Sequence, residues 1–528
     1  MGPRFEVLDA FWLPQRLRHL AEKARWEVHH VLRGQEVREG EGVAVRWPIL
    51  SAEQWDELLA ELGRSRAPAG GELLKRWHAA FERVTERLVE QSEVLDSISR
   101  YTGYPTEMFL LAFGQTSMIH IEAIARTLES PPTWACARRW QPMPDSLGGL
   151  VRFYPGRAGD KVAAAVRGGS PIYSPAPAVD LAIGFAAGNI PGNGLILGLL
   201  LQLANSLSVG GGPARAPAVV VRNSRQAPLM SPWVLSAIEE EDPELVAGLA
   251  MLIWDYQDRP LEQRLLGRAG LVAAAASDQT IAAIDQGIKA SGSRARFHAH
   301  GHKVSFDAVG REALAGEPGS LARLTALDSA LWDQYGCLSA RVHFVERDGR
   351  RTTADYAEAL AGEMRTLAQE MPRGASPIRL IRRAYESYKL LEPSAGVRVF
   401  SRGEDEFLVV QDGRSWGDYL LRETVNACVG RVIVVREIDD LAEIPRRYLS
   451  RIPAQNLQTL GVAADAGRIL SLAEGAGACG VTALRRLGRA SFPQLAYSWD
   501  GYLPLDLGSV RPPGYFTTVE SLDTLSEL

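Results

Sequence analysis

The sequence predicts an α/β protein in which helices cover largely parallel sheets. From residue 178 onward, short apolar runs such as AVVVR (218–222) and GLVAAAA (270–276) alternate with segments of helical spacing, which is the pattern of βαβ units. Glycine-containing turns separate several strands from the helices that follow them. With 46% hydrophobic and 23% charged residues, the chain has the composition of an ordinary globular protein with a large core.

Length, charge and cysteine content narrow the class of protein further. At 528 residues the chain is long enough for about three domains. Its net charge of −5 gives no sign of nucleic-acid binding. The cysteines are scattered and form no C-x-x-C pair, which argues against a disulfide framework and fits a reducing, cytoplasmic location. They are Cys136, Cys337, Cys428 and Cys479.

No segment is expected to span a membrane or to act as a secretory signal. The most apolar run, GLILGLLLQLA (194–204), is about half of the roughly 20 residues that cross a bilayer, so we predict a buried helix there. The first residues, MGPRFEVLDAFWLPQRLRHL, contain no apolar run before a small-residue cleavage site.

The first third of the chain predicts helices followed by a hairpin. From residue 51 to about 128, apolar residues recur at spacings of three and four, as in WDELLAELG, so residues 1–148 are predicted to be a helical N-terminal region. Two alternating runs, GLVRFYPG and KVAAAVRGGSPIYSP, then flank the turn sequence GRAGD and predict a long hairpin over residues 149–177. Its edge would be exposed unless a partner covers it.

The remainder predicts two successive α/β stretches. In the first, helices are expected from about Ser231 to Ile253 and from Ser277 to Ala290, with ARFHAHGHKVSF after them. The second extends from about Asp333 to Ala490 and contains the strand-like runs RVHFVE, FLVVQDG and GRVIVVREI. Ligands of such sheets bind at the carboxyl ends of the strands.

GFAAGNIPGNG (184–194) lies where a predicted strand meets a predicted helix. Its glycines permit a tight turn and close backbone approach, and the helix N-terminus behind it favours negative charge. The spacing is not the G-x-G-x-x-G of a dinucleotide fingerprint, so a ligand-binding role and a purely structural turn both stay open. Asn189 in this turn has a side-chain amide able to donate to a developing oxyanion.

Three of the nine histidines stand at alternate positions in HAHGHK (298–303). In an extended strand they would share one face, as metal ligands do. The alternative is a polar turn at a sheet edge. Because no second cluster of Cys or His is near in the sequence, we predict no metal site.

DQYGCLSARVHF (333–344) places a cysteine on a glycine turn ahead of a strand. Cys337 is a candidate nucleophile, because Gly336 permits an exposed bend and the polar Asp333 and Gln334 precede it. Only the thiolate attacks, so this role needs an electropositive or helix-terminal environment. The alternative is a small buried apolar residue. WDGYLPLDLG (499–508) is likewise either a functional loop or a glycine-bounded turn.

Taken in order, AAGNIPGNG, GHKVSF, WDQYGCLS and WDG resemble the aldehyde dehydrogenase superfamily, and most closely its LuxC-type acyl-CoA reductase branch. The resemblance extends from about Thr102 to Gly501 and implies an oligomer. The implied parts are a Rossmann-like NAD(P)-binding domain (178–310) to which 1–148 contributes, a catalytic α/β domain with the nucleophilic cysteine (311–490), a hairpin arm for oligomerisation (149–177) and a C-terminal segment returning to the hairpin and the cofactor domain (491–528).

The resemblance also implies roles for single residues. Cys337 would carry the acyl group as a thioester, and Asn189 with the backbone N–H of the cysteine would form the oxyanion hole. Arg222 falls where relatives contact the adenosine ribose, and its guanidinium suits a 2′-phosphate. The cofactor-binding residues implied in this way are Gly188, Ile190 and Pro191 on the turn, Arg222, Ser277 facing the pyrophosphate and Gly301 near the nicotinamide.

The sequence departs from the superfamily at two places, of which the first favours reduction over oxidation and the second is the support for a non-catalytic scaffold. Aldehyde-oxidising relatives carry a glutamate where this chain has Ala299, and that glutamate activates the water that hydrolyses the thioester. The segment that commonly holds the nicotinamide ribose is replaced within NACVGRV (426–432).

The expected function is therefore NADPH-dependent reduction of a long-chain acyl-CoA, or another activated acyl group, to the aldehyde. An acyl-supplying protein is the expected partner. The alternatives are a CoA-acylating aldehyde dehydrogenase that works in the oxidative direction, and a non-catalytic acyl-carrying or scaffold subunit.

Overall fold

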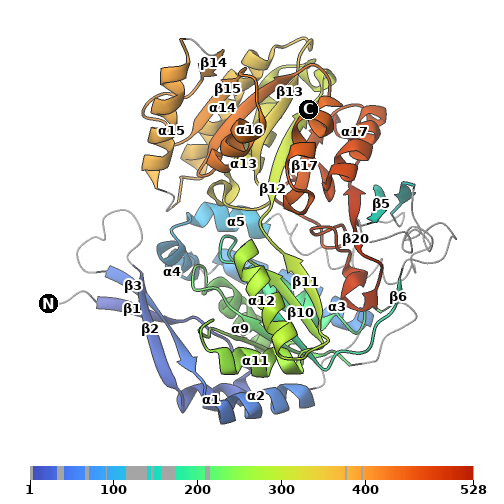
Figure 1. Cartoon of the computed structure of the whole chain (residues 1–528). Coiled ribbons are helices and arrows are strands. Elements are labelled where there is room, and N and C mark those ends of the chain that lie inside the picture. The colour runs from blue at the N-terminus through green and yellow to red at the C-terminus, as the bar shows by residue number, and fades with distance from the viewer. Residues whose placement is uncertain are drawn as a thin grey trace.

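The computed structural model describes residues 4–31, 41–65, 70–90, 92–114, 139–143, 148–155, 173–208, 215–374, 377–393, 396–526 and 528. Within these residues two main sheets occupy opposite halves of the molecule, and a small N-terminal sheet lies beside one of them (Figure 1). The predicted α/β class is confirmed.

The smaller main sheet is parallel, and its five described strands have the order β11-β10-β7-β8-β9. The chain leaves β7 in one direction for β8 and β9 and later returns on the other side, so β7 and β10 flank the point where the strand order reverses. Ligands bind at such a point. The strands are β7 (Leu181–Phe185), β8 (Ala218–Arg222), β9 (Leu249–Leu252), β10 (Leu271–Ala275) and β11 (Arg296–His300).

The helices of this half follow the predicted apolar pattern closely. They are α8 (Asn193–Gln202), α9 (Met230–Glu241), α10 (Pro243–Val246), α11 (Arg259–Arg268) and α12 (Asp278–Ala290). Every residue of α8 after Asn193 is buried, which confirms the predicted buried helix. The helix expected from about Ser231 to Ile253 ends earlier, because Pro243 starts a new short helix and the apolar run 249–252 enters the sheet as β9.

The larger main sheet is mixed, and its ten described strands have the order β14-β15-β16-β13-β12-β17-β18-β20-β5-β4. The strands are β4 (Gln141–Pro142), β5 (Leu150–Pro155), β12 (Val304–Val309), β13 (Ala340–Glu346), β14 (Val397–Val399), β15 (Leu408–Asp412), β16 (Val432–Ile438), β17 (Leu457–Ala463), β18 (Ala483–Arg486) and β20 (Gly514–Val519). The helices are α13 (Pro318–Ala330), α14 (Thr353–Glu370), α15 (Ile378–Leu391), α16 (Asp418–Ala427) and α17 (Ala466–Cys479).

The chain crosses from one main sheet to the other within a few residues. β11 ends at His300 and β12, in the large sheet, begins at Val304. The segment 301–303 therefore lies at the junction of the two halves. Residues 304–310, predicted to belong to the cofactor domain, are thus mostly part of the other sheet.

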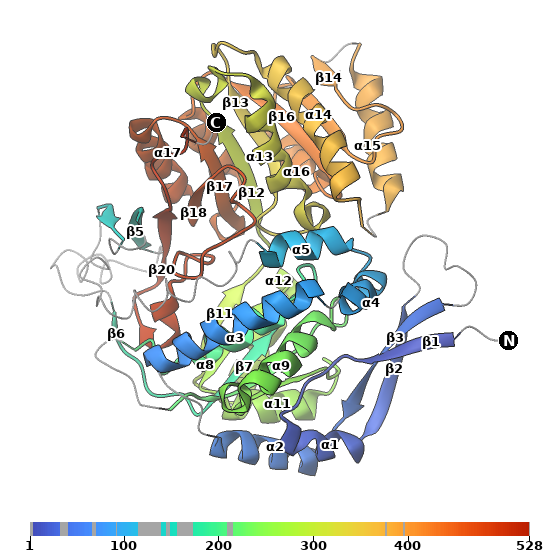
Figure 2. The same cartoon turned by 180° about the vertical axis from the view of Figure 1, so that it is seen from behind.

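The N-terminal region is not helical throughout. Its first part forms a three-stranded sheet with the order β1-β3-β2, and the predicted helical pattern begins at α2. The elements are β1 (Arg4–Asp9), α1 (Arg18–Glu22), β2 (Arg25–Val31), β3 (Glu41–Ile49), α2 (Ala52–Arg64), α3 (Gly70–Glu90), α4 (Ser92–Thr102) and α5 (Thr106–Gly114). Figure 2 shows α5 between the two main halves. There the ring of Phe109 lies 5.6 Å from that of Trp332.

Much of the predicted hairpin over residues 149–177 lies outside the described residues, namely 156–172. Its first strand, β5, pairs antiparallel with β20 and β4 inside the large sheet. The short β6 (Ser174–Pro175) pairs with β19 (Ser509–Val510) near the C-terminus. The C-terminal segment thus meets both ends of the predicted arm, while the arm itself stays a prediction.

Among the described residues, no helix has both the length and the apolar character needed to cross a membrane.

Candidate active site

A cavity of about 640 Å³ lies at the junction of the two main sheets. It opens at the carboxyl ends of β7, β8, β10 and β11, where the strand order reverses. The candidate residues Cys337 and Asn189 both line it. Of the six expected cofactor-binding residues, Gly188, Ile190, Arg222, Ser277 and Gly301 also line it. Pro191 is buried and does not line the cavity.

Cys337 lies on a loop whose backbone is unusual. Trp332, Asp333 and Gln334 all have positive φ angles of 54°, 49° and 63°, a conformation that non-glycine residues adopt rarely and that needs support from the surroundings. That support comes from buried side chains: Asp333 pairs with Arg431 at 3.0 Å, and the Gln334 amide donates to the carbonyl of Ala340 at 2.9 Å. These polar residues therefore anchor the loop and do not activate the thiol.

The loop also fixes the cysteine itself. Ser305 of β12 donates a hydrogen bond of 2.7 Å to the carbonyl oxygen of Cys337. Cys337 is intermediate in exposure as a residue and lines the cavity, although its thiol is well enclosed. Cys428, by contrast, is fully buried.

Asn189 connects the glycine turn to the cysteine loop. Its side-chain Nδ2 donates to the carbonyl of Tyr335, two residues before Cys337, at 2.9 Å. The hydroxyl of Tyr104 donates to the Asn189 carbonyl at 3.2 Å, which holds the turn from the N-terminal side. A side-chain amide has two N–H groups, and Tyr335 accepts only one of them.

The surroundings of Cys337 favour the thiol over the thiolate. Burial, followed by the negative charge of Asp500, raises the pKa of the Cys337 thiol to about 11, and Gln458 and Lys303 oppose this rise only in part. The sequence suggested that a nucleophile needs an electropositive site. The folded chain instead places a carboxylate near the sulfur, together with the cations of Lys303 and Arg341.

A sequence model of the LuxC acyl-CoA reductase family matches residues 183–507. This match covers more than half of the chain and contains both Asn189 and Cys337. The chain belongs to the LuxC acyl-CoA reductase family. It is thus an oxidoreductase of the acyl-to-aldehyde class, and the predicted resemblance is confirmed. Among curated proteins, no sequence match to the chain is found.

Solved structures with the same fold as this LuxC-family chain are aldehyde dehydrogenases. Aldehyde dehydrogenase 21 from Physcomitrella patens, in complex with succinate, is 12% identical, with 99% of this chain and 100% of that chain covered and a TM-score of 0.59. A salicylaldehyde dehydrogenase from Pseudomonas putida G7, complexed with salicylaldehyde, is 12% identical. The match covers 98% of this chain and 99% of that chain, with a TM-score of 0.57.

A third structure of this fold contains a dinucleotide. It is a putative methylmalonate-semialdehyde dehydrogenase from Sinorhizobium meliloti 1021 complexed with NAD, which is 12% identical, with 98% of this chain and 97% of that chain covered and a TM-score of 0.56. At such identities the likeness shows the fold, which confirms the predicted aldehyde dehydrogenase-like architecture.

The cavity of this LuxC-family chain fits a dinucleotide. Gly188 and Gly301 line the cavity without a side chain, and a Cβ atom at either position would collide with Ser224 and Gln226 or with Asp278. Ser277 is the N-cap of α12 and accepts a hydrogen bond from the Thr280 N–H. A helix N-terminus of this kind favours phosphate groups.

Both departures from the superfamily pattern are visible in the structure. Ala299 lies on β11 and does not line the cavity, and Asp500 is the only carboxylate among the described lining residues. None of residues 426–432 lines the cavity either. Arg431 from that segment instead supports the cysteine loop through Asp333.

Sequence reasoning missed the residues that surround the sulfur from other elements. Asp500 and Lys303 belong to the motifs WDG and GHK, which gave the only indication of a role in the site. Nothing in the local sequence indicated which residues they contact. The missed residues are Lys303, Arg341, Gln458 and Asp500.

The histidine motif does not form the three-residue face that an extended strand would give. β11 ends at His300, so His302 falls in the turn beyond it. His298 stacks on Tyr502 with ring centroids 4.8 Å apart, and His300 stacks on Trp499 at 3.8 Å. Within the described residues, no group of His, Cys, Asp or Glu has an arrangement that would hold a metal ion.

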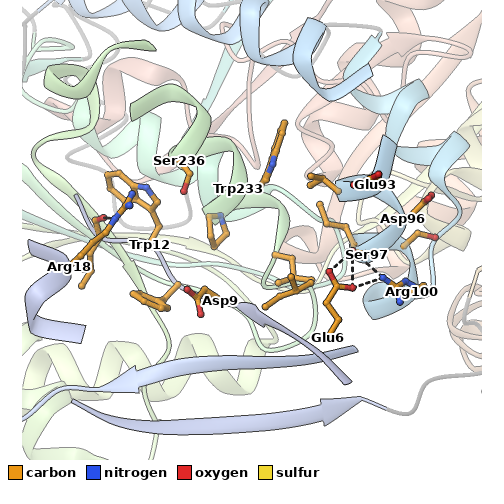
Figure 3. Close-up of a pocket in the computed structure, with 18 residues that line it drawn as sticks. Glu6, Asp9, Trp12, Arg18, Glu93, Asp96, Ser97, Arg100, Trp233 and Ser236 are labelled. Atoms are coloured by element: carbon orange, nitrogen blue, oxygen red, sulfur yellow. Dashed lines mark hydrogen bonds and ion pairs between the residues drawn. The ribbon is translucent and has the colours of Figure 1, made fainter. Parts of the chain in front are cut away.

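A larger cavity of about 1090 Å³ lies elsewhere, between the N-terminal sheet and helices α4 and α9 (Figure 3). Glu6 spans it from β1, accepting hydrogen bonds from Ser97 and Arg100 of α4. Its described lining contains no cysteine or histidine, so it offers none of the nucleophilic chemistry of the cavity at Cys337.

Proposed function

We propose that the protein reduces long-chain acyl-CoA to aldehyde with NADPH, through a thioester on Cys337. The observation that carries this proposal is the hydrogen bond between Asn189 and the Cys337 loop. The support for the proposal is that Asn189, which has a side-chain donor, and the Cys337 thiol line the same cavity.

In the acylation step, the Cys337 sulfur attacks the carbonyl carbon of the acyl-CoA, and the carbonyl electrons move to oxygen. The free N–H of Asn189 and the backbone N–H of Cys337 would donate to this oxyanion. Collapse breaks the bond to the CoA sulfur. The proton of the Cys337 thiol leaves with CoA, so the acyl-enzyme is neutral.

Bound NADPH would supply the hydride for the second step. The same two N–H groups would hold the oxyanion that forms at the thioester carbon. Its collapse breaks the bond to Cys337, returns the electron pair to sulfur, which takes a proton from solvent, and releases the aldehyde. Hydrolysis of the thioester is disfavoured, because the position of the water-activating glutamate is Ala299 and Asp500 is engaged by His300 and Gln458.

A small apolar pocket adjoins the cavity and is the proposed entrance for the acyl chain. It shares His300, Leu495 and Trp499 with the main cavity. Its volume of about 30 Å³ is small, so a chain would have to displace leucine side chains to enter. The further apolar residues around it are Leu197, Leu200, Leu201, Ala273, Leu503, Pro504 and Leu507.

The proposal predicts NADPH-dependent aldehyde formation that is faster with hexadecanoyl-CoA and decanoyl-CoA than with butanoyl-CoA. The reason is the burial of additional methylene groups, each contributing about 0.8 kcal/mol. Aldehyde would be measured by mass spectrometry. NADP reduction that requires both aldehyde and CoA, without measurable acyl-CoA reduction, would indicate the oxidative direction. Absence of NADPH binding would indicate an acyl-carrying scaffold.

A second prediction concerns the choice of cofactor. Arg222 ends β8, lines the cavity and donates from Nε to the Trp254 carbonyl at 3.0 Å, which leaves its terminal amino groups for a 2′-phosphate. Arg222→Leu should raise the KM for NADPH about 10- to 100-fold, as loss of a charged hydrogen-bonding partner does. The KM for NADH should hardly change, and Arg222→Lys should be intermediate. Equal effects on both cofactors would contradict the role.

The remaining expectations are proposals of the same kind. The thiols Cys337, Cys428 and Cys479 are unpaired by disulfides, which suits the reducing cytoplasm that we propose as the location. β4 ends the large sheet at the side of the predicted arm, and this edge would accept a second subunit. An acyl-supplying protein is proposed by analogy with the family only.

A further inference from the structure

The WDG motif places a buried carboxylate in the active-site cavity. Asp500 lines the cavity with Cys337, although only 1% of its side chain is exposed. Its backbone has a positive φ of 54°, and the following Gly501 has a φ of 87°. A non-glycine residue in this conformation is held by its surroundings, and such positions concentrate at functional sites.

Two partners hold the carboxylate from different elements. His300 Nδ1, from the end of β11, lies 2.9 Å from Asp500 Oδ2, and its ring is sandwiched against Trp499. The Nε2 amide of Gln458, from β17, donates to Asp500 Oδ1. Both oxygens of Asp500 are therefore occupied, which leaves the carboxylate poorly placed to act as a base.

Within the described residues, the side-chain amide of Gln458 forms hydrogen bonds through its nitrogen and not through its oxygen. Its Oε1 atom is buried and finds no hydrogen-bond partner within the described part of the chain. An amide nitrogen has two N–H groups, of which Asp500 takes one. Gln458 also acts on Cys337 as a hydrogen-bonding neighbour that lowers the pKa of the thiol, and its second N–H is the group available for that contact.

The charge of Asp500 is present at neutral pH. Burial alone would raise the pKa of this carboxyl group, but Lys303, His300 and Gln458 outweigh burial and hold it below its usual range. A fixed negative charge near the sulfur disfavours the thiolate. The acyl-enzyme has no charge on sulfur, so the carboxylate does not oppose that state.

We propose that Asp500, fixed by His300 and Gln458, is a positioning residue for Cys337. It orients Gln458 as a hydrogen-bond donor to the sulfur, and its charge keeps the resting sulfur in the thiol form, which reacts slowly with oxidants and alkylating agents. The inference deepens the proposed function, because it rests on Cys337 as the residue that carries the acyl group.

The test is the pH profile of Cys337 alkylation by iodoacetamide in the full-length protein, followed by peptide mass spectrometry. Asp500→Asn removes the charge and keeps an acceptor for Gln458. The midpoint of the pH profile should shift to a pH about one unit lower. Alkylation at pH 8 should then be about tenfold faster. Gln458→Leu removes the donor, so the profile should move up and alkylation should become slower.

The two substitutions are expected to shift the alkylation profile in opposite directions. This distinguishes the proposed role from a structural one, because general loosening of the cavity would accelerate alkylation in both variants. Asp506→Asn is the matched control: this buried carboxylate, six residues further on, pairs with Arg511 and should leave the profile unchanged. The charged groups that act on the Cys337 thiol are Asp500, Lys303 and Arg341, and His300 acts through its contact with Asp500.

Cys428, fully buried, provides an internal reference, since its alkylation reports unfolding. If Gln458→Leu unfolds, Gln458→Met removes the same donor with less change of shape. Profiles that coincide with the parent, or that move in the same direction in both variants, overturn the proposal. Alkylation requires neither acyl donor nor cofactor, so this result is independent of whether Cys337 is shown to carry the acyl group.

Discussion

Cys337→Ser is expected to abolish both the acyl-enzyme and aldehyde formation. After incubation with labelled acyl-CoA, intact-protein mass spectrometry should show one acyl adduct on the parent and none on the variant. Addition of NADPH should discharge the parent adduct as aldehyde. The kcat/KM should fall by roughly 10⁴-fold or more, as for other enzymes that lose their nucleophile. A serine hydroxyl cannot replace the thiol, because Asp500, the only carboxylate in the described lining, already accepts hydrogen bonds from His300 and Gln458.

Cys479→Ser is the matched control for this measurement. Cys479 lies on α17, donates to the Pro445 carbonyl and does not line the cavity, so its replacement should keep the adduct and the turnover. An adduct that persists in Cys337→Ser would show that another residue accepts the acyl group, and the proposed function would then be wrong.

Asn189→Ala should reduce kcat by about 10²- to 10³-fold, the usual effect of losing one oxyanion donor. Both half-reactions should slow, because the same amide would hold the oxyanion of acylation and that of reduction. Single-turnover measurements would separate them: adduct formation from acyl-CoA reports the first, and discharge of a preformed adduct by NADPH reports the second.

Asn426→Ala is the control, because it makes the same substitution at an exposed position of α16. Thermal unfolding should be compared as well, since Asn189 also ties the glycine turn to Tyr335. If Asn189→Ala slows neither half-reaction in a folded protein, the amide has only this tying role.

Most of the fold was predictable because it follows from local patterns. The run AVVVR became β8, GLVAAAA became β10 and the apolar segment 194–204 became the buried α8. A fully apolar strand or helix has only one favourable environment, which is the interior. Prediction was less accurate where short elements compete: the run 249–252 extended a helical pattern, and only pairing with β8 makes it a strand.

The candidate site was predictable only in part. The motifs named Cys337 and Asn189, and the structure brings them together around one cavity. Pro191 was expected beside them, but it is buried and does not line the cavity. The contacts of Asp500, His300 and Gln458 could not be predicted, because these residues lie far apart along the chain and meet only where β11, β17 and the C-terminal loop converge.

By itself the sequence determined the α/β class, the succession of strands and helices over most of the chain after residue 178, and the family to which the motifs belong. Periodicity, turn residues and motif order are local properties, and no folding is needed to read them. Only the tertiary structure decided the electrostatic environment of Cys337. The pKa of a thiol depends on its burial and on charges within a few ångströms, and here those come from separate strands and loops that folding brings together.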